Sequence, residues 1–166
     1  MDTSQNDNQV DLRRFAGQFP TGVAVITTAD TDNKLHGLTM SAVTSLSLTP
    51  PLFLICLNNT SNTLTAIKQS GHFGINFLSS DQANICKIFA SKADDKFGTV
   101  AHTFGPAGSP LIDGALAHGE CLVQSTIGEG DHTIVVARLV HTEVRDVAPL
   151  VYHAGKLTAL AEAVPA

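Results

Sequence analysis

One stretch in the first half of the chain decides the fold: Gly37-Leu-Thr-Met-Ser-Ala-Val-Thr-Ser-Leu-Ser-Leu48, followed by Thr49-Pro-Pro-Leu-Phe-Leu-Ile-Cys-Leu57. Residues 37–48 alternate between apolar and hydroxyl-bearing side chains, a pattern typical of a β-strand with two different faces. Two prolines then interrupt the pattern, and residues 52–57 are apolar without alternation, which predicts a strand buried on both sides. The alternating stretch directs Leu38, Met40, Ala42, Leu46 and Leu48 to one face and Thr39, Ser41, Ser45 and Ser47 to the other.

Further strands and three short helices surround this stretch. β-Branched and apolar runs predict strands at residues 23–28, 73–78, 120–127, 133–144 and 150–153. Helical spacing of apolar side chains predicts helices at residues 11–19, 61–70 and 81–92, with capping by Asp11, by Ser61 and Gly71, and by a Ser79–Gln82 capping box. Loops or turns are predicted at residues 30–33, 97–110 and 128–131, and the Ala-rich residues 157–166 are expected to fray.

The order of these elements favours one fold class. About six strands and three helices occur without βαβ alternation or an internal repeat, which favours a closed antiparallel β-barrel flanked by helices over a doubly wound sheet. The 166 residues contain no linker rich in Pro, Ser or charge, so a single domain is expected at residues 11–158. Residues 1–10 are expected to be a disordered N-terminal tail and residues 159–166 a C-terminal tail.

Composition and charge exclude several classes of function. Ten basic against fifteen acidic residues give a net charge of -5, whereas a protein that binds duplex nucleic acid normally has a basic excess. Proteins that bind single strands stack bases on aromatic side chains, yet this chain has no Trp and only one Tyr. No apolar run approaches the ~20 residues that cross a bilayer, so neither nucleic acid nor a membrane is an expected partner. Charged residues make up 15% of the chain, against ~25% in typical soluble domains, which suggests that a second subunit covers part of the surface.

The cysteines and the first residues indicate a cytoplasmic protein. Cys56, Cys86 and Cys121 are odd in number and never form a CxxC pair, which fits free thiols in a reducing compartment. Residues 1–9 are polar and lack the pattern of a signal peptide. The seven histidines are scattered singly, so no metal site is expected, and GxGxxG, P-loop, GxSxG and HExxH motifs are absent from the sequence.

Three polar features are candidates for a binding site, and each has a purely structural alternative. The hydroxyl face that includes Thr39 and Ser41 is either a solvated sheet face or the polar wall of a ligand cleft. Asn58-Asn-Thr-Ser-Asn-Thr63 is either a helix cap or a phosphate site at a helix N-terminus. Gly128-Glu-Gly-Asp-His-Thr133 is either a simple hairpin turn or a turn that presents His132, beside an aspartate, at the rim of a cleft.

Taken together and in this order, these segments resemble the short-chain flavin reductases, the reductase components of two-component flavin-dependent monooxygenases. The resemblance covers roughly residues 15–152. It rests on Phe15-Ala-Gly-Gln-Phe-Pro-Thr-Gly-Val-Ala-Val-Ile-Thr27, on residues 37–58, on Phe73-Gly-Ile-Asn-Phe-Leu78 and on Gly130-Asp-His-Thr133. The chain departs from the family pattern at Met40, Ala42 and Val43, where Val, Ser and an aromatic residue are common.

The resemblance implies a mainly β fold, the FMN-binding split β-barrel with Greek-key topology, usually as a homodimer. It also implies hydride transfer from NADH or NADPH to FMN or FAD, and delivery of the reduced flavin to a partner monooxygenase. Carried over position by position, the isoalloxazine ring would be lined by Thr39, Met40, Ser41, Ala42, Val43 and Ser45. The ribityl and phosphate end would be received by Asn58, Asn59, Thr60, Ser61 and Thr63. The nicotinamide dinucleotide would contact His132, with Pro20, Thr21 and Tyr152 as neighbours.

Hydride transfer of this kind needs no protein nucleophile, because the cofactors carry the chemistry. His132 is therefore the predicted catalytic residue in a positioning or charge-stabilising role rather than as an acid or base. No cluster of arginines marks a pocket for a 2′-phosphate, which favours NADH over NADPH. Two other classes of function are the alternatives: a flavin-binding or storage protein that does not reduce its ligand, and an interaction module without a cofactor.

Overall fold

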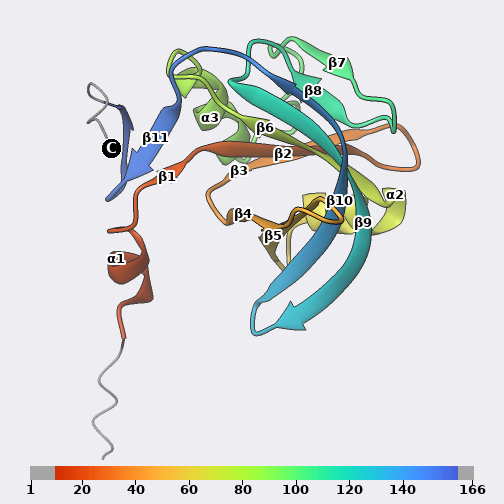
Figure 1. Ribbon diagram of the computed structural model, residues 1–166, viewed down its shortest axis with the longest axis horizontal. Coiled ribbons are helices and arrows are strands. Elements are labelled where there is room, and N and C mark those ends of the chain that lie inside the picture. Colours follow the sequence, from red (N-terminus) through yellow and green to blue (C-terminus); the bar gives the residue numbers. More distant parts are fainter. Residues whose placement is uncertain (1–9, 161–166) are drawn as a thin grey trace, which may run out of the picture.

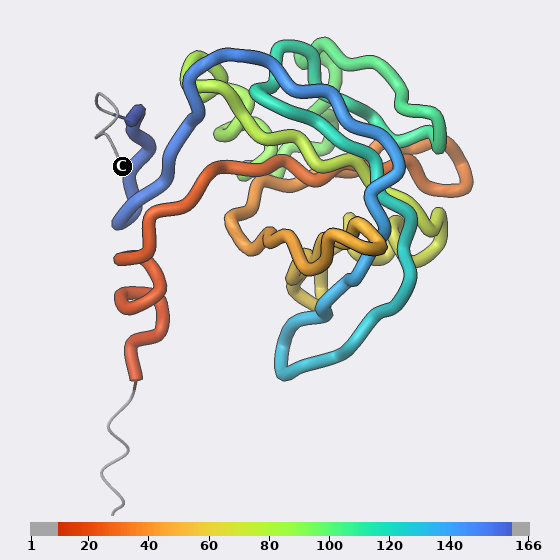
Figure 2. The backbone as a smooth tube through the Cα atoms, viewed as in Figure 1, coloured from red at the N-terminus to blue at the C-terminus, as the bar shows by residue number. Residues whose placement is uncertain are grey.

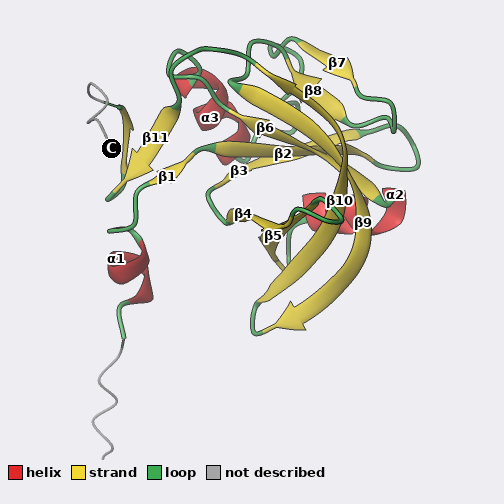
Figure 3. Ribbon diagram, viewed as in Figure 1, coloured by secondary structure: helices red, strands yellow, loops and turns green. Residues whose placement is uncertain are grey.

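Antiparallel strands dominate the computed structural model, which describes residues 10–160 (Figures 1 and 3). The helices are α1 (Leu12–Ala16), α2 (Asn62–Ser70) and α3 (Ala83–Ala90). The strands are β1 (Thr21–Gly22), β2 (Ala24–Ala29), β3 (Leu35–Met40), β4 (Val43–Ser47), β5 (Leu52–Asn58), β6 (His72–Phe77), β7 (His102–Phe104), β8 (Pro110–Ile112), β9 (Ala117–Glu129), β10 (His132–Val144), β11 (Leu150–His153) and β12 (Lys156–Ala159).

Seven strands form the main sheet in the order β3-β2-β6-β9-β10-β5-β4, and every neighbouring pair is antiparallel. β3 and β4 lie at opposite edges of this order, although only residues 41 and 42 separate them in the chain. The sheet must therefore curl until its two edges meet at this short link, as the tube in Figure 2 shows. The result is a barrel with a seam between β3 and β4.

The prediction of one continuous strand over residues 37–48 is wrong, because the chain turns at Ser41–Ala42. The amide of Val43 donates to the carbonyl of Ser41 at 2.9 Å, which closes a tight turn between the two strands. β3 pairs with β2 and β4 pairs with β5, so the turn carries the chain from one sheet edge to the other. Past the turn the predicted apolar face is not buried: Leu46 and Leu48 are 49% and 93% exposed.

Two apolar clusters fill the molecule. The first occupies the barrel interior, where α2 packs Leu64 and Ile67 against strands that include Ile55. The second lies between the barrel and α3, where Phe89 packs with Val25. Burial on both sides, predicted for residues 52–57, holds only in part, because Ile55 and Leu57 are buried whereas the alternate positions of β5 are partly exposed.

The capping residues explain where two helices begin and end. The Ser61 side chain accepts from the amide of Leu64, and Gly71, at φ 76°, ends α2 in the left-handed conformation that glycine adopts without strain. Asp11 caps α1 through the amide of Arg14, as predicted, although the helix stops at Ala16. The capping box before α3 is half formed: the amide of Ser79 donates to Gln82 Oε1, and α3 is shorter than residues 81–92.

The hairpin β7–β8 and the strands β1 and β12 were not predicted. β7 lies inside the predicted loop 97–110 and β8 begins at its last residue, and each strand is only three residues long among Gly and Pro residues that mask the strand pattern. β12 corrects the expectation that residues 157–166 fray, since residues 156–159 pair with β11. The expected N-terminal tail and most of the C-terminal tail lie outside the described residues. Within residues 10–160, no helix is long and apolar enough to cross a membrane.

All three cysteines are free thiols, as the sequence predicted. Cys86 and Cys121 are buried, and Cys56 is partly exposed. Burial raises the pKa of the Cys121 thiol to about 12, and the nearby Glu120 carboxylate acts in the same direction. The thiol of Cys121 therefore stays protonated at neutral pH and serves as a core side chain.

Candidate functional site

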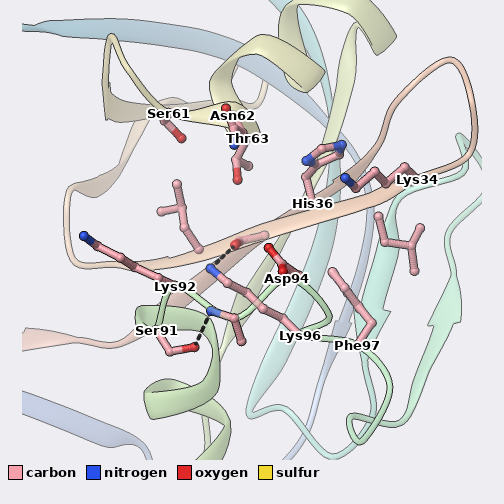
Figure 4. Close-up of a pocket in the computed structure, with 14 residues that line it drawn as sticks. Lys34, His36, Ser61, Asn62, Thr63, Ser91, Lys92, Asp94, Lys96 and Phe97 are labelled. Atoms are coloured by element: carbon pink, nitrogen blue, oxygen red, sulfur yellow. Dashed lines mark hydrogen bonds between the residues drawn. The ribbon is translucent and has the colours of Figure 1, made fainter.

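A cavity of about 350 Å³ lies where β3, the N-terminus of α2 and the loop after α3 come together (Figure 4). We call it the polar cavity. Three separate parts of the chain supply its walls: residues 34–38, residues 61–63, and residues 91–94 with 96 and 97. Charged and hydroxyl-bearing groups predominate among the labelled side chains in Figure 4, with Lys34 and Lys92 on different walls. The cavity therefore offers hydrogen-bond donors and positive charge to an anionic ligand.

The predicted phosphate segment divides into two parts with different environments. Ser61, Asn62 and Thr63 line the polar cavity, and Ser61 also caps α2. The two interpretations of this segment, helix cap and ligand wall, are therefore compatible at Ser61. Helix N-termini favour anions because their first N–H groups lack intrahelical partners.

Asn58, Asn59 and Thr60 instead form local hydrogen bonds. Asn58 Oδ1 accepts from both the amide and the hydroxyl of Thr60, at 2.9 and 2.6 Å. Asn59 reaches the turn between β9 and β10, where its Oδ1 accepts from the Thr133 hydroxyl at 2.7 Å. These three residues lie outside the lining of the polar cavity.

Sequence reasoning missed the lysines of the polar cavity. Lys34 precedes β3, whereas Lys92 and Lys96 lie in the loop after α3, and no motif in the sequence connects the two loops. Lys96 donates from Nζ to the carbonyls of Gly37 and Phe89, each at 3.1 Å. Burial lowers the pKa of Lys96. The family resemblance was the one signal available for these lysines, but the motifs on which it rests do not include residues 91–97.

A turn stiffened by hydrogen bonds to Asp30 carries Lys34. Asp30 Oδ1 accepts from the amides of Asp32 and Lys34, and Oδ2 lies 2.8 Å from His36 Nε2. The hydrogen bond from His36 lowers the pKa of Asp30, with smaller contributions from the two backbone amides. His36 itself lines the cavity. The Asp30–His36 pair thus fixes both the turn and one wall of the site.

A second cavity, of about 590 Å³, opens along the seam of the barrel. We call it the seam cavity. It brings together five of the predicted site residues, and its lining comprises Ala16, Phe19, Pro20, Thr21, Gly22, Ala24, Ser41, Ala42, Val43, Thr44, Leu54, Cys56 and Phe77. Among the described residues, Thr21 Oγ1 is buried without a hydrogen-bond partner. A buried hydroxyl without a partner costs free energy, so an acceptor or donor atom that enters the cavity and bonds to Thr21 would stabilise the structure.

Three residues predicted at the ring lie outside both cavities. Thr39 faces α3, and its hydroxyl donates to the carbonyl of Cys86 at 2.7 Å. Met40 packs against the first apolar cluster. Ser45 is exposed on the edge strand β4. The predicted alternation therefore holds in β3 as far as Met40, but the face of β3 that carries Thr39 contacts α3 and not a cavity.

His132 lies where β10 begins, and it shares a sheet face with the wall of the seam cavity. Directly opposite residues of an antiparallel pair point to the same face. In the register of β10 and β5, His132 is opposite Asn58, and the next position on this face pairs Ile134 with Cys56. Cys56 lines the seam cavity. His132 therefore lies on the same face of the sheet as this cavity wall, two positions further along the paired strands.

The imidazole of His132 is held by its neighbour in the turn. Its Nδ1 lies 2.6 Å from Asp131 Oδ1, and its side chain is 46% exposed. This hydrogen bond lowers the pKa of Asp131, which keeps the carboxylate charged beside the ring. Tyr152 also lies beside the seam cavity, because the pairing of β1 with β11 puts it directly opposite Thr21, which lines that cavity. Within residues 10–160, no three His, Cys, Asp or Glu side chains are grouped to hold a metal ion.

Known proteins resemble this chain over most of its length. The model of the flavin reductase like domain matches residues 16–161. The reductase subunit HsaB of a flavin-dependent monooxygenase from Rhodococcus jostii is 39% identical over 155 residues, covering 91% of this chain and 79% of that protein. Nitrilotriacetate monooxygenase component B from Mycobacterium thermoresistibile is a solved structure with 35% identity and a TM-score of 0.88, covering 93% of this chain and 88% of its own.

A third relative was solved with pieces of both cofactors. The NADH:FAD oxidoreductase SgcE6 of Streptomyces globisporus, in complex with NAD and FAD fragments, is 31% identical with a TM-score of 0.87, covering 97% of this chain and 98% of its own. These likenesses confirm the predicted mainly β, split-barrel fold class and the resemblance read from the sequence. The chain belongs to the flavin reductase-like domain family.

Proposed function

We propose that the protein is an NAD(P)H-dependent flavin reductase that transfers hydride to FMN or FAD and supplies the reduced flavin to a partner monooxygenase. The relatives named as reductases favour this activity over flavin storage, the alternative from the sequence. The observation that carries the proposal is that one short segment serves both cavities: residues 34–38 line the polar cavity, and residues 41–44 line the seam cavity. A flavin has the matching form, with a planar ring at one end and a phosphate at the other.

The residues present fit such a ligand. The polar cavity supplies lysine and helix-terminal donors for the phosphate, from Ser61 and Thr63. The seam cavity is lined by apolar side chains and by the unpartnered Thr21 hydroxyl, as a ring with an apolar face and polar edge atoms requires. Ser41, Ala42 and Val43 line the seam cavity, on the ring side.

The other predicted site residues have supporting roles in this proposal. Thr39 and Met40 fix β3 against α3 and the core, so they hold the wall rather than touch the ring. Asn58, Asn59 and Thr60 fix the turn that carries His132. The remaining predicted contacts, Ser45, Pro20 and Tyr152, border the seam.

The protein contributes position and electrostatics to the reaction. The reduced nicotinamide donates the hydride, and a bound flavin would supply the acceptor. The chain has to hold the two rings in contact, at ~3–3.5 Å between the reacting atoms, and to exclude water from them. His132, with Asp131 beside it, would orient the nicotinamide dinucleotide from the open side of the seam cavity.

A second copy of the chain is proposed to cover two apolar surfaces. Leu12 and Phe15 in α1, and Phe19 just after it, are exposed by 67%, 79% and 74%, and α1 stands away from the barrel in Figure 1. The outer face of the sheet adds Ile127, which is 47% exposed. The seam cavity lies between these surfaces because Phe19, Leu54 and Cys56 line it. A homodimer would therefore bury both surfaces and close the cavity.

Two further expectations stay proposals. The domain is taken as residues 11–158, which the match of the family model to residues 16–161 supports. A cytoplasmic location is supported by the three free thiols.

The activity is tested by following the loss of NADH or NADPH absorbance with FMN, FAD and riboflavin added in turn. The proposal predicts flavin-dependent oxidation of the nicotinamide. A tightly held flavin that neither nucleotide reduces would instead establish the storage alternative. Light scattering of the same sample should give twice the monomer mass, and Phe15→Ser should shift it toward the monomer.

His132→Ala tests the nicotinamide side. Losing one positioning contact should raise the KM for NADH about three- to tenfold, the equivalent of about 1 kcal/mol, and leave flavin binding unchanged. His141→Ala, on the same strand but at its other end, is the matched control. Unaltered kinetics in His132→Ala would remove His132 from the site.

A further inference from the structure

Phe19 places a free aromatic ring in the wall of the seam cavity. The residue lines the cavity although it is 74% exposed. Phe77, the other phenylalanine of the lining, packs against the first apolar cluster, and its ring centroid lies 6.4 Å from that of Phe53. Within residues 10–160, Phe19 belongs to neither apolar cluster and to no aromatic pair. A second copy over its outer side would leave the side toward the cavity open, so this ring is available to a ligand.

The backbone is fixed on both sides of Phe19. The amide of Phe19 donates to the carbonyl of Ala16 at 3.1 Å. After it, Pro20 restricts the chain, and Thr21 pairs with Tyr152 across β1 and β11. The ring can turn about its own side-chain bonds, but the backbone sets its place in the cavity wall. Because aromatic rings pair by offset stacking or edge-to-face contact, the partner that fits this side chain is the flat ring of a ligand.

The seam cavity offers no ionic partner to a charged ligand ring. Of the described residues that line it, none carries a charged side chain. The carboxylate of Asp131, beside His132, lies outside the lining and is 86% exposed, so solvent screens its charge. The nicotinamide ring is neutral in NADH and carries a positive charge after it has given up hydride. An aromatic face attracts a cation, so the free ring of Phe19 is the group of the lining that can compensate this new charge.

We propose that Phe19 determines how tightly the protein holds its oxidised product: its ring stacks on the nicotinamide and binds the cationic ring of NAD⁺ more strongly than the neutral ring of NADH. This inference rests on the proposed function and extends it to control by product. NAD⁺ that accumulates occupies the seam cavity and slows further reduction of flavin. A cation–π contact of this kind corresponds to about a three- to thirtyfold difference in affinity.

The test is direct binding of NAD⁺ and of ADP-ribose, which is the same dinucleotide without its nicotinamide ring. Both are titrated by calorimetry into the oxidised protein saturated with FMN, so no turnover occurs. Phe19→Leu removes the aromatic face, and Phe19→Tyr keeps it. Phe15→Leu is the matched control, because Phe15 is 79% exposed one helical turn earlier but lies outside the lining of the seam cavity.

Phe19→Leu should weaken NAD⁺ binding about three- to thirtyfold and leave ADP-ribose binding within twofold. In steady-state assays its inhibition constant for NAD⁺ should rise more than its KM for NADH, whereas Phe19→Tyr and Phe15→Leu should match the wild type. Equal losses for NAD⁺ and ADP-ribose, or an unchanged affinity for NAD⁺, would overturn the inference. The ratio of the two affinities decides even if a variant changes its oligomeric state, because the ligands differ only in the nicotinamide. Failure of the proposed function is distinguishable, since the wild type would then oxidise NADH with no flavin.

Discussion

Replacing Gly37 by alanine tests how closely the site depends on core packing. Gly37 lies in β3, its carbonyl accepts from Lys96, and the side of the strand without a side chain contacts the ring of Phe89. A Cβ added at this position would be 2.7 Å from Phe89 Cε1, 2.9 Å from Cδ1 and 3.1 Å from the carbonyl oxygen of Ile26. The ring and the neighbouring strand must both move to accept it.

The magnitude follows from these contacts. Forcing an extra methyl group into a packed core costs about 1–3 kcal/mol. For a chain of this size each kcal/mol lowers Tm by about 2–4 °C, so Gly37→Ala should lower Tm by about 2–12 °C. Because Phe89 also provides the carbonyl bonded by Lys96, the KM for FMN should rise as well.

Gly128→Ala is the matched control. An added Cβ at Gly128 meets nothing within 4 Å. The same substitution should there be neutral or stabilising by up to about 1 kcal/mol. Urea unfolding of both variants gives the comparison, and Phe89→Leu in the Gly37→Ala background should recover part of the loss relative to the sum of the single changes. Equal unfolding free energies for the two alanine variants would refute the packing argument.

Three further results are expected. Glu120→Gln should lower the free energy of unfolding by about 2–4 kcal/mol. The buried carboxylate of Glu120 accepts from two backbone amides at 2.6 and 2.7 Å, whereas the carboxamide of Gln would turn its NH₂ group toward one of them. A urea midpoint equal to that of the wild type would contradict this. Cys121 should be the slowest of the three thiols to alkylate in the native protein at neutral pH, as peptide mapping after timed labelling would show. The lowered pKa of Asp30 means that its bond to His36 stabilises the fold above the ordinary value of 3.8 and is lost as pH falls through the lower folded value. The difference in unfolding free energy between the wild type and Asp30→Asn should therefore be constant near neutral pH and shrink below about pH 4, and a difference that grows with acid would reverse the argument.

Local signals predicted the elements well, because capping and alternation act between near neighbours. Ser61 and Gly71 set the limits of α2 as expected. In β3 the predicted alternation holds, because Leu38 and Met40 pack against the first apolar cluster whereas Thr39 bonds to α3. The partner of Thr39 belongs to α3, which begins more than forty residues later in the chain, so local sequence could not predict this contact. The predicted single hydroxyl face does not exist, because the turn at Ser41–Ala42 places Thr39 against α3 and Ser45 on the opposite edge strand.

The site itself could be predicted only where motifs mark it. Residues 41–43 and Ser61 stand in distinctive stretches, so the sequence singled them out, and they line the two cavities. Lys34, Lys92 and Lys96 were not singled out, since a lysine in a polar loop usually indicates only a solvated surface. Tertiary folding alone brings these loops together at one cavity. The turn at Ser41–Ala42 was missed because both strands it connects continue the same polar–apolar alternation.

The two-residue link at Ser41–Ala42 has a consequence for access to the interior. It joins the first and last strands of a seven-stranded sheet, so the width of the slot between them is limited by the reach of two peptide units. One glycine inserted there would lengthen the tether by up to about 3.3–3.6 Å. A longer link would let the two edge strands separate further and widen this slot. The length of the connection therefore sets how far the seam of the barrel can open.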